Sequence, residues 1–111
     1  MKILHLHLKK EWYDMIYSGE KPEEYREDKK YWCKIFLKTD YVLFSYRNGY
    51  QSCNVKNYTH VLFYYGYTKK TMLFEINDII YGYGNPKWGA PKDKKVFIIQ
   101  LGKHQWPTTS R

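Results

Sequence analysis

The sequence predicts one α+β domain: about five to six short strands, mostly antiparallel or mixed, form a curled sheet or small β-barrel with two to three short helices. Two observations predict this class. The 111 residues are 43% hydrophobic, which is enough for a single core. Strand-like and helix-like patterns also alternate early and give way to several strands. Closure of so many short strands into a partial barrel protects their edges.

The first two elements are a strand and a helix. Residues 3–8 alternate, with three leucines on one face and Ile3, His5 and His7 on the other, which is typical of a half-buried strand. Residues 9–18 have helical spacing, and Gly19 is expected as a left-handed C-terminal cap. The expected apolar stripe of this helix is Trp12, Met15 and Ile16.

A short extended segment and a second helix follow. Pro22 prevents the first helix from continuing, and residues 23–27 are expected to be extended. Asp28 is expected to cap a helix over residues 29–37. Its apolar stripe is expected to be Tyr31, Trp32, Ile35 and Phe36.

The remaining chain has strand character. A hairpin is expected where residues 41–47 are followed by Asn48 and Gly49, and a second one around residues 68–70. The glycine- and proline-rich residues 82–91 are expected to form a long loop. The later strands are expected at residues 61–67, 71–81 and 96–101, and a frayed tail at 103–111.

The net charge of +8 is unevenly distributed. Residues 1–28 sum to −2 and residues 29–111 to +10, because the later segment has fourteen Lys and Arg against four Asp and Glu. Cations interleaved with aromatic rings are what a single-stranded nucleic-acid surface needs. Lysine-rich proteins without a polyanionic partner have the same composition, so both interpretations stay open on composition alone.

Cysteine and histidine usage indicates a reduced, metal-free protein. Cys33 and Cys53 have no CxxC spacing, and His5 and His7 lack a third ligand nearby in sequence. No apolar run approaches the roughly 20 residues of a membrane span, and the N-terminal residues lack a secretory pattern. We therefore expect a soluble cytoplasmic protein with no cofactor, no metal and no membrane partner.

The least generic segment runs from Gly19 to Arg26 and reads GEKPEEYR. If Glu24 and Arg26 lie on one strand, they project to the same face, where carboxylate and guanidinium can pair. Lys21, in the preceding turn, is within reach of the same pocket.

This pattern, GxKxxExR, resembles the signature of the ASCH domain family of the PUA-like superfamily, which are small RNA-associated β-barrels. Nearly the whole chain takes part in the resemblance. The further blocks that carry it are the opening strand and Trp-bearing helix, Tyr31–Trp32, VLFYYGY at 61–67, TMLFEI at 71–76, KWGA at 87–90 and FIIQLGK at 97–103.

The resemblance implies RNA binding or processing. Some members are amidohydrolases that act on acetylated cytidine, and others are described as ribonucleases. Lys21 matches the proposed catalytic lysine of the amidohydrolase branch. That branch has a threonine three positions later, where this chain has Glu24, so a hydroxyl nucleophile is missing there.

Three hypotheses follow, in this order. In the first, the domain binds RNA or a modified nucleoside, with Lys21, Glu24 and Arg26 reading a base or phosphate. The additional ligand-binding residues expected are Tyr65, Tyr67, Lys69 and Trp88. In the second, the chain is a small hydrolase in which Lys21 and Glu24 are catalytic. In the third, the Glu24–Arg26 pair has only a structural role.

Overall fold

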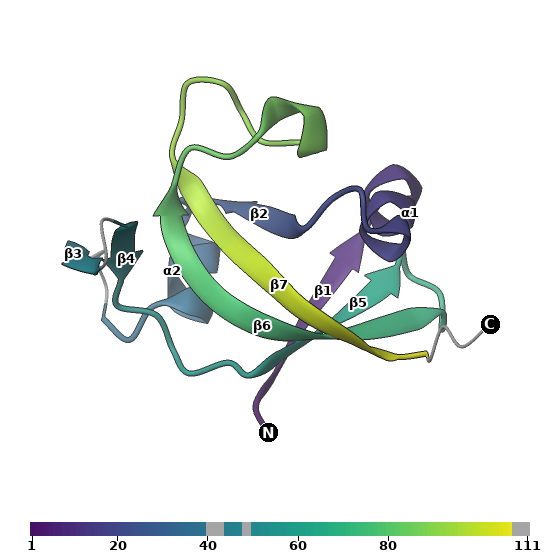
Figure 1. Cartoon of the computed structure of the whole chain (residues 1–111). Coiled ribbons are helices and arrows are strands. Elements are labelled where there is room, and N and C mark those ends of the chain that lie inside the picture. Colours follow the sequence, from purple (N-terminus) through teal and green to yellow (C-terminus); the bar gives the residue numbers. More distant parts are fainter. Residues whose placement is uncertain (40–43, 48–49, 108–111) are drawn as a thin grey trace.

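The structure, a computed structural model of the chain, describes residues 1–39, 44–47 and 50–107. The predicted α+β class is confirmed, with helices beside a curled, mixed sheet (Figure 1). In chain order the elements are β1 (Ile3–Leu8), α1 (Lys10–Ser18), β2 (Glu23–Glu27), α2 (Lys30–Phe36), β3 (Phe44–Arg47), β4 (Tyr50–Cys53), β5 (His60–Tyr65), β6 (Thr71–Gly82), the short 3-10 helix η1 (Pro86–Trp88) and β7 (Val96–Trp106).

The main sheet is a half-barrel with the spatial order β1–β5–β6–β7–β2. β1 pairs with β5 in parallel, and the other neighbours in this order are antiparallel. Register shifts between Leu73 and Asp78 interrupt the β6–β7 ladder, and such irregularities bend and twist a sheet. β1 and β2 stand at the two ends of this strand order and are the edge strands of the half-barrel. We call the gap between them the seam.

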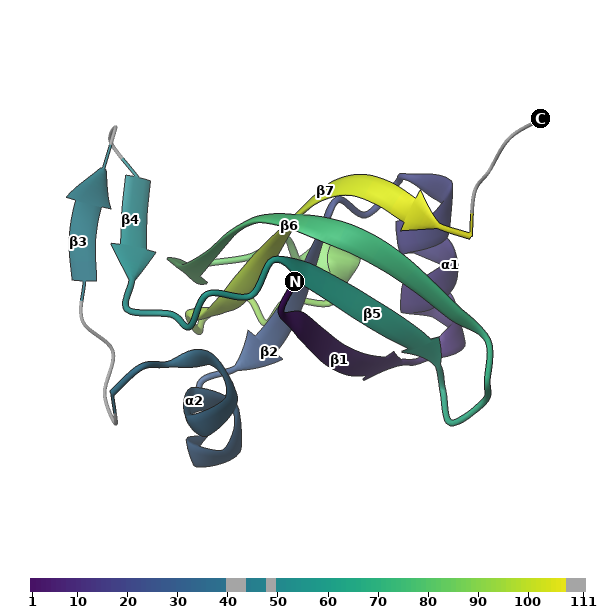
Figure 2. The same ribbon diagram turned by 90° about the horizontal axis from the view of Figure 1, so that it is seen from below.

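The β3–β4 hairpin projects away from the half-barrel, as Figure 2 shows. It joins the main sheet through the pairing of Ser52 in β4 with Ile80 in β6. The predicted first hairpin is confirmed, because Arg47 lies opposite Tyr50 in an antiparallel pair. Its expected turn residues, Asn48 and Gly49, and residues 41–43 of the expected strand lie outside the described residues.

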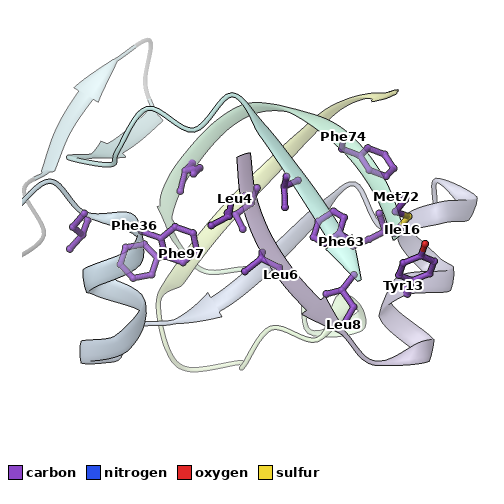
Figure 3. Packing of buried hydrophobic residues seen from close by; sticks show 14 residues of the cluster. Leu4, Leu6, Leu8, Tyr13, Ile16, Phe36, Phe63, Met72, Phe74 and Phe97 are labelled. Carbon is purple, nitrogen blue, oxygen red and sulfur yellow. The ribbon is translucent and has the colours of Figure 1, made fainter. Parts of the chain in front are cut away.

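The core fills the inside of the half-barrel (Figure 3). The alternation of β1 is confirmed, because its three leucines are buried and His5 and His7 are exposed on the opposite face. At one end Phe36 of α2 packs on Phe97 of β7 with ring centroids 5.0 Å apart. At the other end, α1 adds Tyr13 and Ile16 to the core. α1 and α2 thus close opposite ends of the same core.

Two predictions about the helices need correction. The buried aromatic residue of α1 is Tyr13, whereas Trp12 is only half-buried, because adjacent residues lie about 100° apart around a helix. Asp28 does not cap α2: the residue before the helix is Lys29, which makes no side-chain cap. The Asp28 carboxylate instead accepts hydrogen bonds from the Tyr81 hydroxyl and the Cys33 thiol. The expected cap at Gly19 is confirmed, with a φ of 89°.

Strand ends also differ from the sequence-based expectation. β5 ends at Tyr65, so Tyr67 lies in the turn to β6 rather than in the strand. β7 continues to Trp106, so residues 103–106 of the expected frayed tail belong to this strand, and His104 and Trp106 pair with β6. This extension is stabilised by the His104 ring, which stacks on Phe74 at 4.4 Å between centroids. Residues 108–111 lie outside the described part of the chain.

Candidate functional site

A cleft of about 300 Å³ opens at the seam between β1 and β2. Its lining comes from β1, α1, β2, α2 and the loop before β7. Figure 1 shows how these segments meet: the η1 loop lies over β2 and beside α1. Residues from the first third of the chain and from residues 88–96 thus come together at one place.

Three charged side chains form the floor of this cleft. Lys21 is 2% exposed and Glu24 is 3% exposed, and their Nζ and Oε1 atoms lie 2.8 Å apart. The second carboxylate oxygen, Oε2, accepts a hydrogen bond from Nη1 of Arg26. We call Lys21, Glu24 and Arg26 the triad. Both oxygens of its one carboxylate are occupied by cations, and the triad retains one net positive charge.

The Lys21 ammonium is enclosed by aromatic rings and by one carbonyl. Its Nζ lies 4.7 Å from the ring centroid of Trp12 and 5.0 Å from that of Tyr25. It also donates a hydrogen bond to the backbone oxygen of Trp88. Cation–π contacts and a carbonyl replace part of the water that a buried ammonium loses. The GxKxxExR lysine is therefore held in place rather than projected into solvent.

Arg26 is the member of the triad nearest to solvent, with its side chain 15% exposed. Its Nη1 donates to the backbone oxygen of Tyr25 at 2.8 Å, and its Nη2 donates to that of His7 at 3.0 Å. The contact with His7 crosses the seam from β2 to β1. The guanidinium carbon lies 5.1 Å from the Trp32 ring centroid. Arg26 thus bridges the two edge strands while it faces the cleft.

The predicted loop at residues 82–91 forms the roof over the triad. Gly84 lies so close to Tyr25 that an added Cβ would be 2.5 Å from its ring, and a Cβ at Gly89 would be 3.0 Å from the Trp12 ring. Gly89 also has a φ of 99°, in the left-handed region that favours glycine. The backbone N–H of Asn85 donates to the Tyr25 hydroxyl at 3.0 Å. Glycines are required here because the loop backbone lies directly on the rings.

Burial of Tyr25 and the hydrogen bond from its hydroxyl to Glu23 raise its pKa above the usual range. The phenol therefore stays neutral at neutral pH and keeps both hydrogen bonds, to Glu23 and from Asn85. This arrangement fixes the roof loop to β2.

The walls of the cleft are aromatic. Trp12, Trp32 and Trp88 line it, and they are three of the four tryptophans of the chain. All three residues are half-buried. The charged side chains that line the cleft are Lys9, Lys21, Arg26, Glu24 and Glu27. Such a site can hold a flat ring between indoles and place an anionic or carbonyl group near Arg26.

The structure brings together four of the seven predicted ligand-binding residues: Lys21, Glu24, Arg26 and Trp88 all line the cleft. The other three do not line it. Tyr65 packs edge-on against Tyr13 at 5.2 Å between centroids, and Tyr67 and Lys69 lie in the β5–β6 turn. The lining residues that sequence reasoning missed include the aromatic side chains of His7, Trp12, Tyr25 and Trp32.

A signal for two of the missed residues was present in the sequence. Trp32 lies in α2 and Tyr25 within the motif itself, between Glu24 and Arg26. Their closeness to the motif marks them as candidates, whereas their place in the cleft depends on how α2 and the roof loop pack on β2.

Of the other reactive groups, His7 lines the cleft, whereas Cys33, Cys53 and His5 do not. Cys33 and Cys53 are free thiols. The Nδ1 atoms of His5 and His7 interact with the Tyr64 hydroxyl and the Gly66 oxygen at 2.8 and 2.7 Å. Within the described ranges, no group of three or more His, Cys, Asp and Glu side chains is arranged to hold a metal ion. No helix among the described residues is long and apolar enough to cross a membrane.

Comparisons of the chain with protein-family models, with curated proteins and with solved structures gave no match.

Proposed function

We propose that the chain is an RNA- or nucleoside-binding domain of the ASCH and PUA-like type, and that the seam cleft is its binding site. The observation that carries the proposal is the combination of a buried triad with one net positive charge and walls formed by three tryptophans. Nucleic-acid bases that are not stacked in a duplex bind to aromatic rings and to Arg guanidinium planes. The cleft presents aromatic rings and a guanidinium to the same ligand.

Charge supports a nucleotide rather than a neutral aromatic ligand. Glu24 is paired with both cations, so the triad retains one net positive charge, and Arg26 is its member nearest to solvent, where a phosphate or a base carbonyl would lie. Lys9 adds a second exposed cation at the rim. Outside the cleft, Lys30, Lys34, Lys38 and Lys56 gather around α2 and supply point charges for a phosphate backbone.

The alternative, a hydrolase that uses Lys21 and Glu24, has less support. Both oxygens of Glu24 are paired with cations, and Lys21 Nζ is enclosed by Trp12, Tyr25 and the Trp88 carbonyl. Among the described residues that line the cleft there is no Ser, Thr or Cys to act as a nucleophile. We expect no acetate release from N4-acetylcytidine, and sustained release would favour the hydrolase instead.

Tryptophan fluorescence tests the binding proposal directly, because three of the four indoles line the cleft. The protein is titrated at low salt with uridine 5′-monophosphate, with cytidine 5′-monophosphate and with a single-stranded RNA. We expect saturable quenching that weakens as salt rises, with a slope of about 0.7 per phosphate contact for the single strand. Absence of quenching by all three ligands would contradict the proposal.

A matched pair of variants locates the site. Trp88→Leu removes a cleft indole, and Trp106→Leu removes the indole at the end of β7, which does not line the cleft. We expect Trp88→Leu to weaken nucleotide binding about five-fold or more, since a stacked base contributes about 1–3 kcal/mol. Trp106→Leu should leave affinity within two-fold, and equal losses in the two variants would place the ligand elsewhere.

A further inference from the structure

A stack of three rings lies on the outer face of β1 and β5, beside the cleft. His7 of β1 stacks on Tyr64 of β5 with centroids 4.7 Å apart and planes 28° apart, and on Tyr67 of the β5–β6 turn at 4.7 Å and 26°. We call Tyr64, His7 and Tyr67 the ring stack. The contact between His7 Nδ1 and the Gly66 oxygen at 2.7 Å fixes the orientation of its central ring.

The ring stack is not part of the hydrophobic core. The core side of β1 is formed by its leucines, and His7 points to the other face. Tyr67 is 91% exposed, so most of its ring surface is in contact with water although it lies against His7. A row of aligned, exposed rings is what proteins use to stack successive bases of a single strand.

The ring stack is continuous with the cleft through His7. His7 lines the cleft, and its backbone oxygen accepts the hydrogen bond from Arg26. Two lysines are near this path in the chain: Lys9 lines the cleft, and Lys69 lies in the same turn as Tyr67. Lys70 instead lies over the rings of Tyr65 and Tyr13. A chain of nucleotides that leaves the cleft past His7 therefore meets flat rings and positive charge together.

We propose that the ring stack is a second base-binding subsite, and that the ligand is a single-stranded nucleic-acid segment of at least two nucleotides rather than a free nucleoside. This inference rests on the proposed function of the cleft. One nucleotide occupies the cleft, and the base of its neighbour stacks on Tyr67. Tyr65, which packs against Tyr13, does not take part.

The test compares a mononucleotide with a tetranucleotide by the quenching of the cleft tryptophans. The ligands are uridine 5′-monophosphate and a uridine tetranucleotide, and the variants are Tyr67→Ala, Tyr67→Phe and Tyr17→Ala. Tyr17 is an exposed tyrosine of α1 that lines neither the cleft nor the ring stack, so Tyr17→Ala is the matched control. Tyr67→Phe keeps the ring and removes only the hydroxyl.

We expect the wild type to bind the tetranucleotide at least ten-fold more tightly than the mononucleotide. Tyr67→Ala should weaken tetranucleotide binding about five-fold or more and leave the mononucleotide within two-fold. Tyr67→Phe and Tyr17→Ala should behave like the wild type. If Tyr67→Ala leaves the tetranucleotide unchanged, or weakens both ligands equally, the second subsite is refuted while the cleft remains. If neither ligand binds the wild type, both proposals are refuted.

Discussion

Replacement of Glu24 by glutamine tests whether the triad is held together as the geometry indicates. At the 2.8 Å separation of Lys21 and Glu24, the gross attraction is about 6 kcal/mol for an effective dielectric constant of about 20. Much of this attraction is offset by the several kcal/mol that each buried ion loses in hydration. Glu24→Gln removes the attraction and keeps the cost of burying Lys21. We therefore expect the free energy of unfolding to fall by about 3–5 kcal/mol.

The loss of stability should depend on which member of the Lys21–Glu24 pair is replaced. Lys21→Met removes a buried cation and leaves Glu24 paired with Arg26, so it should cost less than Glu24→Gln. The double variant no longer buries an unpaired ammonium. Its loss should be smaller than the sum of the single losses by about 1 kcal/mol or more, the coupling expected of residues in direct contact.

Urea and thermal unfolding followed by circular dichroism measure these changes. A loss of about 3 kcal/mol corresponds to a Tm decrease of more than about 10 °C for a domain of this size. Glu27→Gln is the matched control, because Glu27 is on the same strand with its side chain 60% exposed and should change stability by less than about 0.5 kcal/mol. The reasoning is wrong if Glu24→Gln costs under 1 kcal/mol, or no more than Glu27→Gln.

Two further predictions concern the roof loop and the thiols. Gly84→Ala should destabilise the protein by about 1–3 kcal/mol because its Cβ would lie 2.5 Å from the Tyr25 ring. Gly82→Ala is the control and should destabilise the protein less, because the nearest atom to its Cβ would be 4.0 Å away. Equal urea midpoints for the two variants would contradict this prediction. Burial raises the pKa of Cys33 and of Cys53 to about 11 from 9.0. Iodoacetamide at pH 8 should therefore alkylate the folded protein about 100-fold more slowly than the unfolded chain. A ratio of the two rates below about ten would refute this prediction. Because the folded state binds these thiol protons more tightly, their stabilising effect is complete below about pH 9 and is lost as pH rises through about 11.

The sequence predicted most elements because their signals are local. The alternation of residues 3–8, the glycine cap at residue 19 and the two hairpins depend on neighbours within a few positions, and the structure confirms them. The Asp28 cap failed because the Tyr81 hydroxyl, distant in sequence, and the Cys33 thiol, a side chain of α2 itself, compete for its carboxylate. The end of β7 was placed too early because its last residues depend on pairing with β6.

The sequence predicted the floor of the candidate site but, of its three wall tryptophans, only Trp88. The spacing of Glu24 and Arg26 gives the same strand face, and the structure brings them and Lys21 into one cluster. The walls depend on packing between elements that are far apart in sequence. Trp12 faces the cleft only because Tyr13 takes the core position on α1, and Trp88 reaches it because the roof loop folds back onto β2.

The position of the cleft follows from the incomplete closure of the barrel. In the described part of the chain, β1 pairs along its length with β5 alone and β2 with β7 alone, so the seam presents two strand edges. Exposed strand edges can pair with strands of other molecules unless they are covered. Arg26 donates across the seam to the His7 carbonyl, and the roof loop lies above it. The side chains that protect the seam are thus the same ones that face the cleft. A ligand at this place meets fixed cations and rings whose positions are already set by folding, so its binding requires little further ordering of the protein.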